Sequence, residues 1–225
     1  VLGKLMSLQA NKVKQEEQSF VNLADAALAI TEAEQKVFDE MGAKKSFVIE
    51  NGVDLENFDF KNPQKTIGKK LLFVGNFSYF PNVDAISFFY YDVFSRLDDY
   101  ELVVVGKEAG KLPFITDPRV SIVPFVPDIK DVYYDADIIV SPVRIGGGTN
   151  FKILEAMACG LPIVAHPARI GSLGLKAGEH LQVAITKQET IEKLKELENF
   201  TFRKKMVESA REYVEEHYSW EVIGK

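Results

Sequence analysis

Cysteine, tryptophan and an excess of positive charge are what this sequence lacks. Its 225 residues include one Cys and one Trp, and 33 Asp and Glu against 27 Lys and Arg give a net charge of −6. A chain without a basic face is poorly suited to phosphate backbones, so we exclude nucleic acid as the main partner. Cys159 has no second cysteine to pair with, and we expect it to be a buried structural thiol in a reducing cytoplasm.

Metal-ligand clusters and long apolar runs are scarce as well. The three histidines, His166, His180 and His217, are not grouped with Cys or Asp at the spacing of a zinc site, so we expect no bound metal. His166 follows a predicted strand, where a side chain can face a cleft, whereas His180 and His217 are predicted to lie at the surface. No segment approaches the ~18 apolar residues needed to cross a bilayer.

The sequence does contain short apolar runs that alternate with amphipathic stretches. The runs at 71–75, 101–106 and 137–141 have the continuous apolar character of strands covered on both faces. Strands that alternate with helices at this spacing form parallel sheets with right-handed crossovers. The prediction is therefore an α/β fold with a Rossmann-like parallel sheet flanked by helices. The other expected strands are 120–123, 161–165 and 180–184, and the expected helices are 82–96, 128–135, 151–159, 188–197 and 201–217.

The first part of the chain departs from this pattern. Residues 1–42 are predicted to be helical except for a buried strand at 24–30, and Thr31 with Glu34 forms a capping box that starts the helix 32–41. A strand at 46–50 follows, and the next residues up to the main sheet have the composition of a linker. We therefore divide the chain into 1–54, a linker at 55–69, a main domain at 70–200 and a helical segment at 201–225.

The strongest functional signal lies between residues 141 and 158. A predicted strand runs into three consecutive glycines, which cost conformational entropy and therefore need a reason. The backbone N–H groups of such a loop and of the following helical turn can bind an anion, and Arg144 and Lys152 flank them with positive charge. A flexible loop with an ordinary helix cap is the alternative explanation. The predicted anion-binding loop comprises Gly146, Gly147, Gly148, Thr149 and Asn150.

Glu155 lies three residues after Lys152, on the same face of the predicted helix. A surface ion pair is one explanation and would contribute little. However, the residues that follow, Ala156 to Gly160, are too small and apolar for an exposed helix. A carboxylate beside a phosphate site is well placed to accept both hydroxyls of a ribose, and we expect the helix dipole to keep it ionised.

A family resemblance covers roughly residues 20–222. The segment 155–165 reads EAMACGLPIVA and resembles the signature of the group 1 (family 4) glycosyltransferases, which have the two-domain GT-B fold. Residues 49–54 resemble the crossover between the two domains of that family, and residues 218–221 resemble its C-terminal helical region. Residues 120–126 together with 133–137 resemble the segments that line its base pocket.

The resemblance implies a reaction and a set of roles. It implies transfer of a hexose from a nucleotide-diphosphate donor with retention of configuration, without a metal or another cofactor. Glu155 would hold the donor ribose, the backbone near Phe125 and Val126 would meet the base, and Gly75 and Asn76 would contact the donor. Residues 70–200 would be the donor-binding domain and residues 1–54 the end of an acceptor domain, so we expect the chain alone to be inactive.

Two departures from the family pattern matter. The family's second glutamate, eight residues before Glu155, is replaced by Gly147. The segment after the first strand of the donor domain, residues 75–85, contains no Arg or Lys, and Pro81 with Asn82 equally indicates a plain helix start. We infer that Arg144 and Lys152 take over neutralisation of the diphosphate as catalytic residues, because phosphates require charge rather than a given chain position.

This variant resembles bacterial sugar transferases that act in polysaccharide assembly. The expected partners are a nucleotide sugar and a sugar or lipid-linked acceptor, with peripheral membrane contact through a domain outside this sequence. The expected location is the cytoplasm, with the inner face of the membrane as its site of contact. Two alternatives stay open. One is a nucleotide-sugar epimerase on the same fold, and the other is a non-catalytic nucleotide-binding module, which the missing second glutamate favours.

Overall fold

The computed structural model describes residues 2–114, 116–145 and 151–224, and the chain divides into two compact units, residues 1–51 and 52–225. In the first unit, two short strands pair in parallel. Thr31 caps the second helix by accepting a hydrogen bond from the Glu34 N–H, and the Glu34 carboxylate accepts one from the Ile30 N–H. The elements of this unit are α1 (Leu2–Leu23), β1 (Ala27–Ala29), α2 (Glu32–Glu40) and β2 (Ser46–Val48).

The prediction of a buried strand at 24–30 is wrong in length and in burial. The strand β1 spans three residues, of which Ala29 is buried while Leu28 is 61% exposed. A two-stranded sheet has two faces, and within this unit α2 packs against both of its strands. The apolar run therefore contains a strand, as expected. Leu28 of that strand is nevertheless exposed, because no described residue of this unit packs over its side chain.

The second unit is built on a parallel sheet of six strands in the order β5-β4-β3-β6-β7-β8. Successive strands add outward on one side from β3 to β5, and then the chain crosses back to place β6 on the other side of β3. This confirms the predicted fold class, and the order is that of a dinucleotide-binding sheet with its switch point between β3 and β6. The strands are β3 (Lys70–Val74), β4 (Glu101–Val105), β5 (Val120–Val123), β6 (Ile138–Ser141), β7 (Ile163–Ala165) and β8 (Gln182–Val183).

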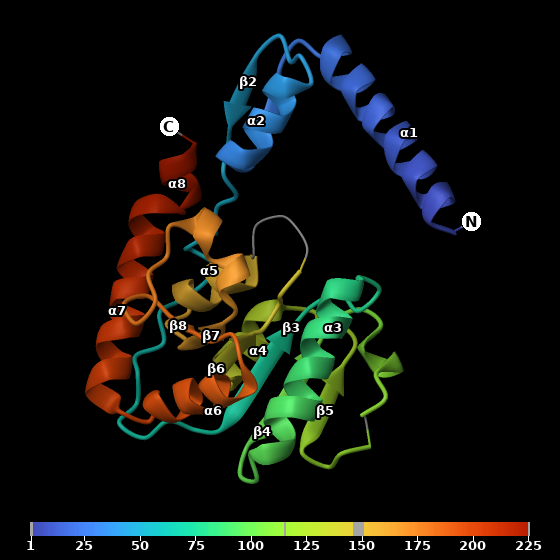
Figure 1. The fold of residues 1–225 in the computed structure, drawn as a ribbon. Helices are drawn as coiled ribbons and strands as arrows, with labels where there is room; N and C mark the ends of the chain where they lie inside the picture. The colour runs from blue at the N-terminus through green and yellow to red at the C-terminus, as the bar shows by residue number, and fades with distance from the viewer. Residues whose placement is uncertain (1, 115, 146–150, 225) are drawn as a thin grey trace. The chain divides into compact units, whose positions relative to one another are not determined.

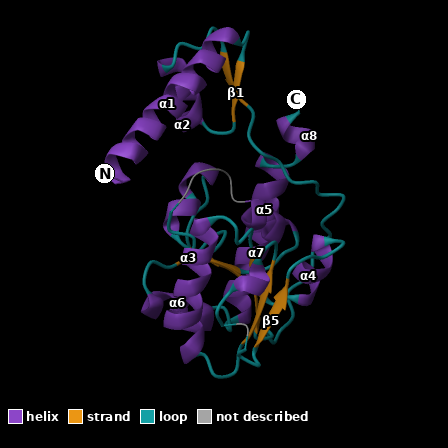
Figure 2. Cartoon of the chain, turned by 90° about the vertical axis from the view of Figure 1, so that its right-hand side faces the viewer, coloured by secondary structure: helices purple, strands orange, loops and turns teal. Residues whose placement is uncertain are grey.

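Helices cover both faces of this sheet (Figures 1 and 2). One face carries α3 and α6, and the other carries α4, α5 and α7, with α5 and α7 side by side. In Figure 2, α3 and α6 lie to the left of the orange strands and α4 lies to their right. The helices are α3 (Phe80–Phe88), α4 (Ile129–Asp135), α5 (Phe151–Ala158), α6 (Lys187–Glu196), α7 (Phe200–His217) and α8 (Trp220–Ile223). Among the described helices, none combines the length and apolar character needed to span a bilayer.

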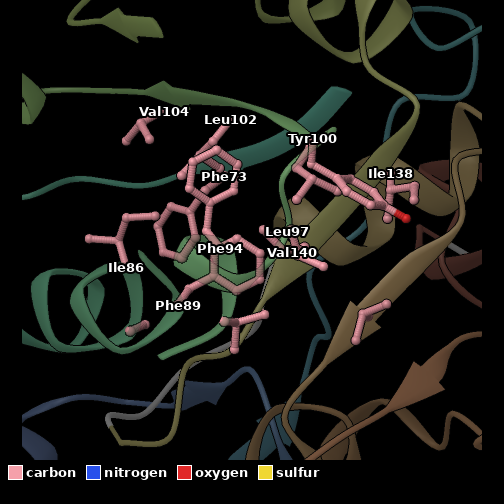
Figure 3. Close-up of a cluster of buried hydrophobic side chains, with 14 of the residues drawn as sticks. Phe73, Ile86, Phe89, Phe94, Leu97, Tyr100, Leu102, Val104, Ile138 and Val140 are labelled. Atoms are coloured by element: carbon pink, nitrogen blue, oxygen red, sulfur yellow. The ribbon is translucent and has the colours of Figure 1, made fainter. Parts of the chain in front are cut away.

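The hydrophobic cores on the two faces of the main sheet differ in the size of their side chains. Figure 3 shows the core beneath α3, where large rings such as Phe73, Phe89 and Phe94 fill the space between helix and sheet. The core beneath α5 contains smaller side chains, among them Ala156 and Cys159. Cys159 is fully buried, and burial raises the pKa of its thiol to about 12, so the prediction of a structural thiol is confirmed.

The helix predicted at 82–96 begins two residues earlier and changes geometry along its length. After α3 the chain forms a π-helical turn at Phe89–Val93 and a 3₁₀ turn at Phe94–Arg96. Phe89, Val93 and Phe94 are all fully buried. An uninterrupted α-helix would turn Phe94 away from the sheet at 100° per residue, so the altered turns keep all three side chains in the core.

Residues 55–69 contain no helix or strand and are tied to the amino ends of the strands. The Lys61 ammonium donates to the carbonyls of Tyr134 and Ala136 at 2.9 and 3.0 Å. The Arg203 guanidinium, which is 2% exposed, donates to the Gln64 carbonyl at 2.6 Å and also to the carbonyls of Lys65 and Leu197. A cavity of about 110 Å³ lies among these residues.

The two C-terminal histidines differ in burial. His217 is exposed, as predicted, but His180 is buried. The ring of His180 packs against Tyr213 of α7 with 4.5 Å between centroids, and burial lowers the pKa of its imidazole. The prediction of a surface position for His180 is therefore wrong, because α7 covers it.

Candidate functional site

The candidate site lies at the switch point of the sheet. The chain leaves β3 toward α3 on one face and leaves the neighbouring β6 toward α5 on the other. Sheets of this kind bind their ligands beyond the carboxyl ends of the strands at such a point. Gly75 and Asn76 follow β3 directly, and Arg144 lies three residues after the end of β6.

After β3, the chain continues through Gly75, which has no side chain, into a turn at Asn76–Ser78 that is held by its own hydrogen bonds. The Gly75 N–H donates to the Val105 carbonyl at 2.9 Å, and a Cβ placed on Gly106 would lie 1.9 Å from the Gly75 carbonyl oxygen. Gly106 also has a φ of +137°, which side-chain-bearing residues rarely adopt. The Asn76 carboxamide oxygen accepts from both the N–H and the hydroxyl of Ser78, so this oxygen holds the turn.

Arg144 is bound to α3. Its Nε and Nη2 donate to the Asp84 carboxylate at 3.2, 2.8 and 2.9 Å, and its guanidinium lies 4.8 Å from the centroid of the Phe88 ring. The Arg144 side chain is 40% exposed and that of Asp84 is 24% exposed. The guanidinium is therefore fixed in plane and position by an acid and an aromatic ring of one helix.

Lys152, in the first turn of α5, is also brought to the start of α3. Its ammonium lies 3.5 Å from the Asn82 carboxamide oxygen and 4.8 Å from the centroid of Phe73. Asn82 in turn donates to the Asn76 carbonyl at 2.9 Å. The fold thus gathers Arg144, Lys152 and the end of β3 around the N-terminal turns of α3, although no basic residue belongs to that segment.

Glu155 is half-buried on α5, next to a tyrosine from α4. The Tyr133 hydroxyl, which is fully buried, donates to the Glu155 carboxylate at 2.6 Å. Burial raises the pKa of Glu155, while the Tyr133 hydrogen bond and the charge of Lys152 act in the opposite direction with smaller effect. The net shift is opposite to the one expected from the helix dipole alone, because that expectation left out desolvation.

Ser141, the last residue of β6, places a hydroxyl group beside the switch point. Its side chain is fully buried, and its hydroxyl has no hydrogen-bond partner in the described part of the chain. The neighbouring His166, which follows β7, donates its N–H to the Ser141 carbonyl at 3.0 Å. The His166 ring nitrogen Nδ1 accepts from the Ala168 N–H at 3.2 Å, so this half-buried histidine caps the turn after β7.

The other predicted site residues lie farther from the switch point or outside the described residues. Phe125 and Val126 follow β5, the edge strand two places from β3. Phe125 is 80% exposed, and Val126 is half-buried and packs on the α5 side of the sheet. The predicted anion-binding loop, Gly146, Gly147, Gly148, Thr149 and Asn150, lies outside the described residues.

The sequence analysis gave no individual role in the site to four residues: Asn82, Asp84, Tyr133 and Ser141. Tyr133 and Ser141 lie in segments that it named, and a signal existed for the other two. An amide and an acid stand in the first turns of the helix that follows β3, but that segment was considered only for basic residues and for a helix start. Within the described residues, no group of three or more His, Cys, Asp or Glu side chains is placed to hold a metal ion.

Solved structures share this fold. The Anabaena protein HepE, crystallised with UDP and glucose, superposes with a TM-score of 0.75 at 17% identity, covering 93% of this chain and 64% of its own. Sucrose-phosphate synthase from Thermosynechococcus elongatus superposes with 0.76 at 17% identity, covering 95% and 59%. The C-terminal domain of a group 1 family glycosyl transferase from Francisella tularensis gives 0.55 at 19% identity, covering 75% of this chain and 100% of its own.

These likenesses show the fold, which is that of GT-B glycosyltransferases, and this chain spans less than two thirds of the first two proteins. No curated protein matches the sequence closely enough to serve as a relative. A family model described as glycosyl transferases group 1 matches residues 68–199, which include every described strand of the main sheet and the helices from α3 to α6. Because that match covers more than half of the chain, the protein belongs to the group 1 glycosyl transferases.

Proposed function

We propose that this chain is the donor-binding part of a GT-B glycosyltransferase that takes a hexose from a nucleoside diphosphate sugar. Structures of the Anabaena neighbour hold UDP or UDP-glucose, which supports a donor of this class. The observation that carries the proposal is the position of Arg144 and Lys152, which both contact α3 beside the switch point. Two cations at the carboxyl ends of parallel strands, one of them in the first turn of a helix, suit a diphosphate.

Each part of the donor has a counterpart among the predicted residues. Arg144, Lys152 and the backbone amides of residues 146–150 would bind the diphosphate, and Glu155, oriented by Tyr133, would accept hydrogen bonds from the ribose hydroxyls. Phe125 and Val126 would contact the base. The backbone at Gly75 and Asn76 would lie against the phosphates from the β3 side, where Gly75 offers no side chain to obstruct them.

The two cations also supply a route to catalysis. Negative charge develops on the departing diphosphate, and fixed cations that face it stabilise the transition state without a metal or another cofactor. We extend the proposal to a retaining reaction of the family 4 type. The acceptor would be a sugar or lipid-linked sugar of a bacterial cell-surface polysaccharide, engaged at the cytoplasmic face of the membrane. Because this chain spans about 64% of HepE, turnover would need acceptor-side residues beyond it.

Calorimetry with UDP and GDP tests the donor site directly. We expect binding of at least one nucleoside diphosphate, and each of Lys152→Ala and Arg144→Ala should weaken it by about 1.5–3 kcal/mol, the contribution of a charged hydrogen bond. Glu155→Gln should weaken binding of the nucleoside diphosphate, which has a ribose, but leave binding of inorganic pyrophosphate unchanged. This difference separates contacts with the ribose from contacts with the phosphates.

Lys204→Ala is the matched control for lost charge. Lys204 lies on α7, half-exposed, with Glu208 as its ion-pair partner. Its removal lowers the positive charge of the protein by the same amount as Lys152→Ala, and we expect UDP affinity to stay at the wild-type value. Absence of binding to any nucleoside diphosphate at millimolar concentration, or equal affinity in the Lys152, Arg144 and Lys204 variants, contradicts the proposal.

A further inference from the structure

The first two turns of α3 hold both of the predicted diphosphate cations. Asp84 binds Arg144 through two carboxylate oxygens, and Asn82 lies 3.5 Å from the Lys152 ammonium. Arg144 and Lys152 belong to the segment after β6, whereas Asn82 and Asp84 follow β3. The contacts therefore join the two sides of the switch point through side chains that the proposed function has not used.

The hydrogen bonds of Arg144 leave a defined part of its guanidinium available. Nε and Nη2 face the Asp84 carboxylate, and the ring of Phe88 lies 4.8 Å from the guanidinium carbon. In the described part of the chain, Nη1 donates to no residue, and the side chain as a whole is 40% exposed. A guanidinium held along one edge keeps N–H donors on its other edge, in a fixed plane.

We propose that Asp84 is a positioning residue for the diphosphate site. It holds Arg144 along its Nε–Nη2 edge, so that Nη1 is presented to a phosphate oxygen in one orientation. This inference rests on the proposed function, since it concerns how Arg144 meets the diphosphate of the donor. Asp84 touches no substrate atom itself and acts through Arg144, with Phe88 as the second support of the guanidinium.

Two effects of removing Asp84 on the affinity for UDP have opposite signs. Removing a carboxylate near a phosphate site raises the local positive potential and should strengthen binding of an anion. Loss of positioning weakens binding, because a free arginine side chain must give up its rotamer freedom when it meets the phosphate. The direction of the change in affinity therefore distinguishes a positioning residue from a mere nearby charge.

The experiment is a double-mutant cycle on UDP affinity, measured by calorimetry. We expect Asp84→Ala to weaken UDP binding about tenfold, the factor that corresponds to about 1.4 kcal/mol. Asp84→Asn keeps an acceptor oxygen for Nη2 and should lose less. In an Arg144→Ala background, Asp84→Ala should cause no further loss, because the group that it orients is gone.

Asp131→Ala is the matched control, since Asp131 is an exposed acid in the first turn of α4 and its loss changes net charge equally. Circular dichroism and melting temperature verify that each variant folds. If Asp84→Ala does not fold, the UDP affinity of Asp84→Asn provides the test instead. Equal or tighter UDP binding by a folded Asp84 variant overturns the positioning role and leaves the donor site intact. Wild-type protein that binds no nucleoside diphosphate overturns both the proposed function and this inference.

Discussion

The two ends of the main sheet hold their cations in different ways. At the amino ends of the strands, Lys61 and Arg203 donate to backbone carbonyls. At the carboxyl ends, Arg144 and Lys152 contact the side chains of Asp84 and Asn82. A backbone carbonyl in a packed segment has few alternative hydrogen-bond donors and costs free energy when it has none. A cation that donates to such a carbonyl therefore stabilises the fold. A cation held by partly exposed side chains can also meet a ligand, which suits a binding site.

The largest expected effect comes from removing Arg203. Arg203→Met keeps the apolar stem but removes the buried guanidinium that donates to the carbonyls of Leu197 and Gln64. We expect the free energy of unfolding to fall by about 2–4 kcal/mol. Urea unfolding followed by the fluorescence of Trp220, the single tryptophan, measures this value.

Arg144→Met is the comparison at the other end of the sheet. Its ion pair with Asp84 is partly exposed, and such pairs contribute about 0–1 kcal/mol. We therefore expect little change in stability together with weakened UDP binding. If Arg144→Met destabilised the protein as much as Arg203→Met, the distinction between the two ends would be wrong.

Removing Lys61 should have a smaller effect of the same kind. Its ammonium satisfies the carbonyls of Tyr134 and Ala136 at the end of α4, where the helix dipole also favours a positive charge. We expect Lys61→Met to lower the free energy of unfolding by about 1 kcal/mol, because the Lys61 side chain is only half-buried whereas Arg203 is 2% exposed. UDP affinity should not change, and a loss of affinity would show that the two ends are coupled.

The carboxyl-end residue Glu155 predicts a pH dependence. Burial raises the pKa of its carboxyl above the ordinary value of 4.5, so the neutral form favours the folded state. Wild-type stability therefore loses this contribution as the pH rises from about 4.5 through the folded-state pKa. Glu155→Gln stays neutral at every pH, so its advantage over wild type should be absent below pH 4.5 and should grow above it. Parallel stability profiles of the two proteins would contradict the buried position of this carboxylate.

The smallest expected change comes from Ser141. The buried Ser141 hydroxyl has no hydrogen-bond partner among the described residues, and a buried hydroxyl in that state costs free energy. Ser141→Ala should therefore stabilise the ligand-free protein by up to about 1 kcal/mol. The shift in melting temperature would be a few degrees for a chain of this size, roughly 2–4 °C. Destabilisation by the alanine would mean that the hydroxyl is satisfied after all, and that this part of the carboxyl end also maintains the fold.

The main sheet could be predicted from the sequence because its central strands are continuous apolar runs. The segments that became β3, β4 and β6 have no competing pattern, and Gly75, Gly106 and Pro142 follow them directly. The π-helical turn at Phe89–Val93 could not be predicted in this way. Its residues have ordinary helical composition, and the change of geometry depends on which rings the sheet can accommodate.

The candidate site was predicted in part for the same reason. Arg144, Lys152 and Glu155 follow one strand closely, and local sequence was enough to select them. The Arg144–Asp84 pair joins residues 60 positions apart and depends on β6 lying beside β3, which no local pattern specifies. The burial of His180 likewise depends on the distant Tyr213 of α7, which its neighbours in the sequence do not reveal.

The contact between Gly106 and Gly75 limits how this protein can be re-engineered. Any side chain at position 106 would push against the Gly75 carbonyl, and Gly75 leads directly to Asn76, whose carbonyl anchors Asn82 of α3. A library intended to alter donor choice would therefore lose most of its members to misplaced backbone if it varied these two glycines. Diversity belongs at positions such as Phe125, which follows β5 and is 80% exposed.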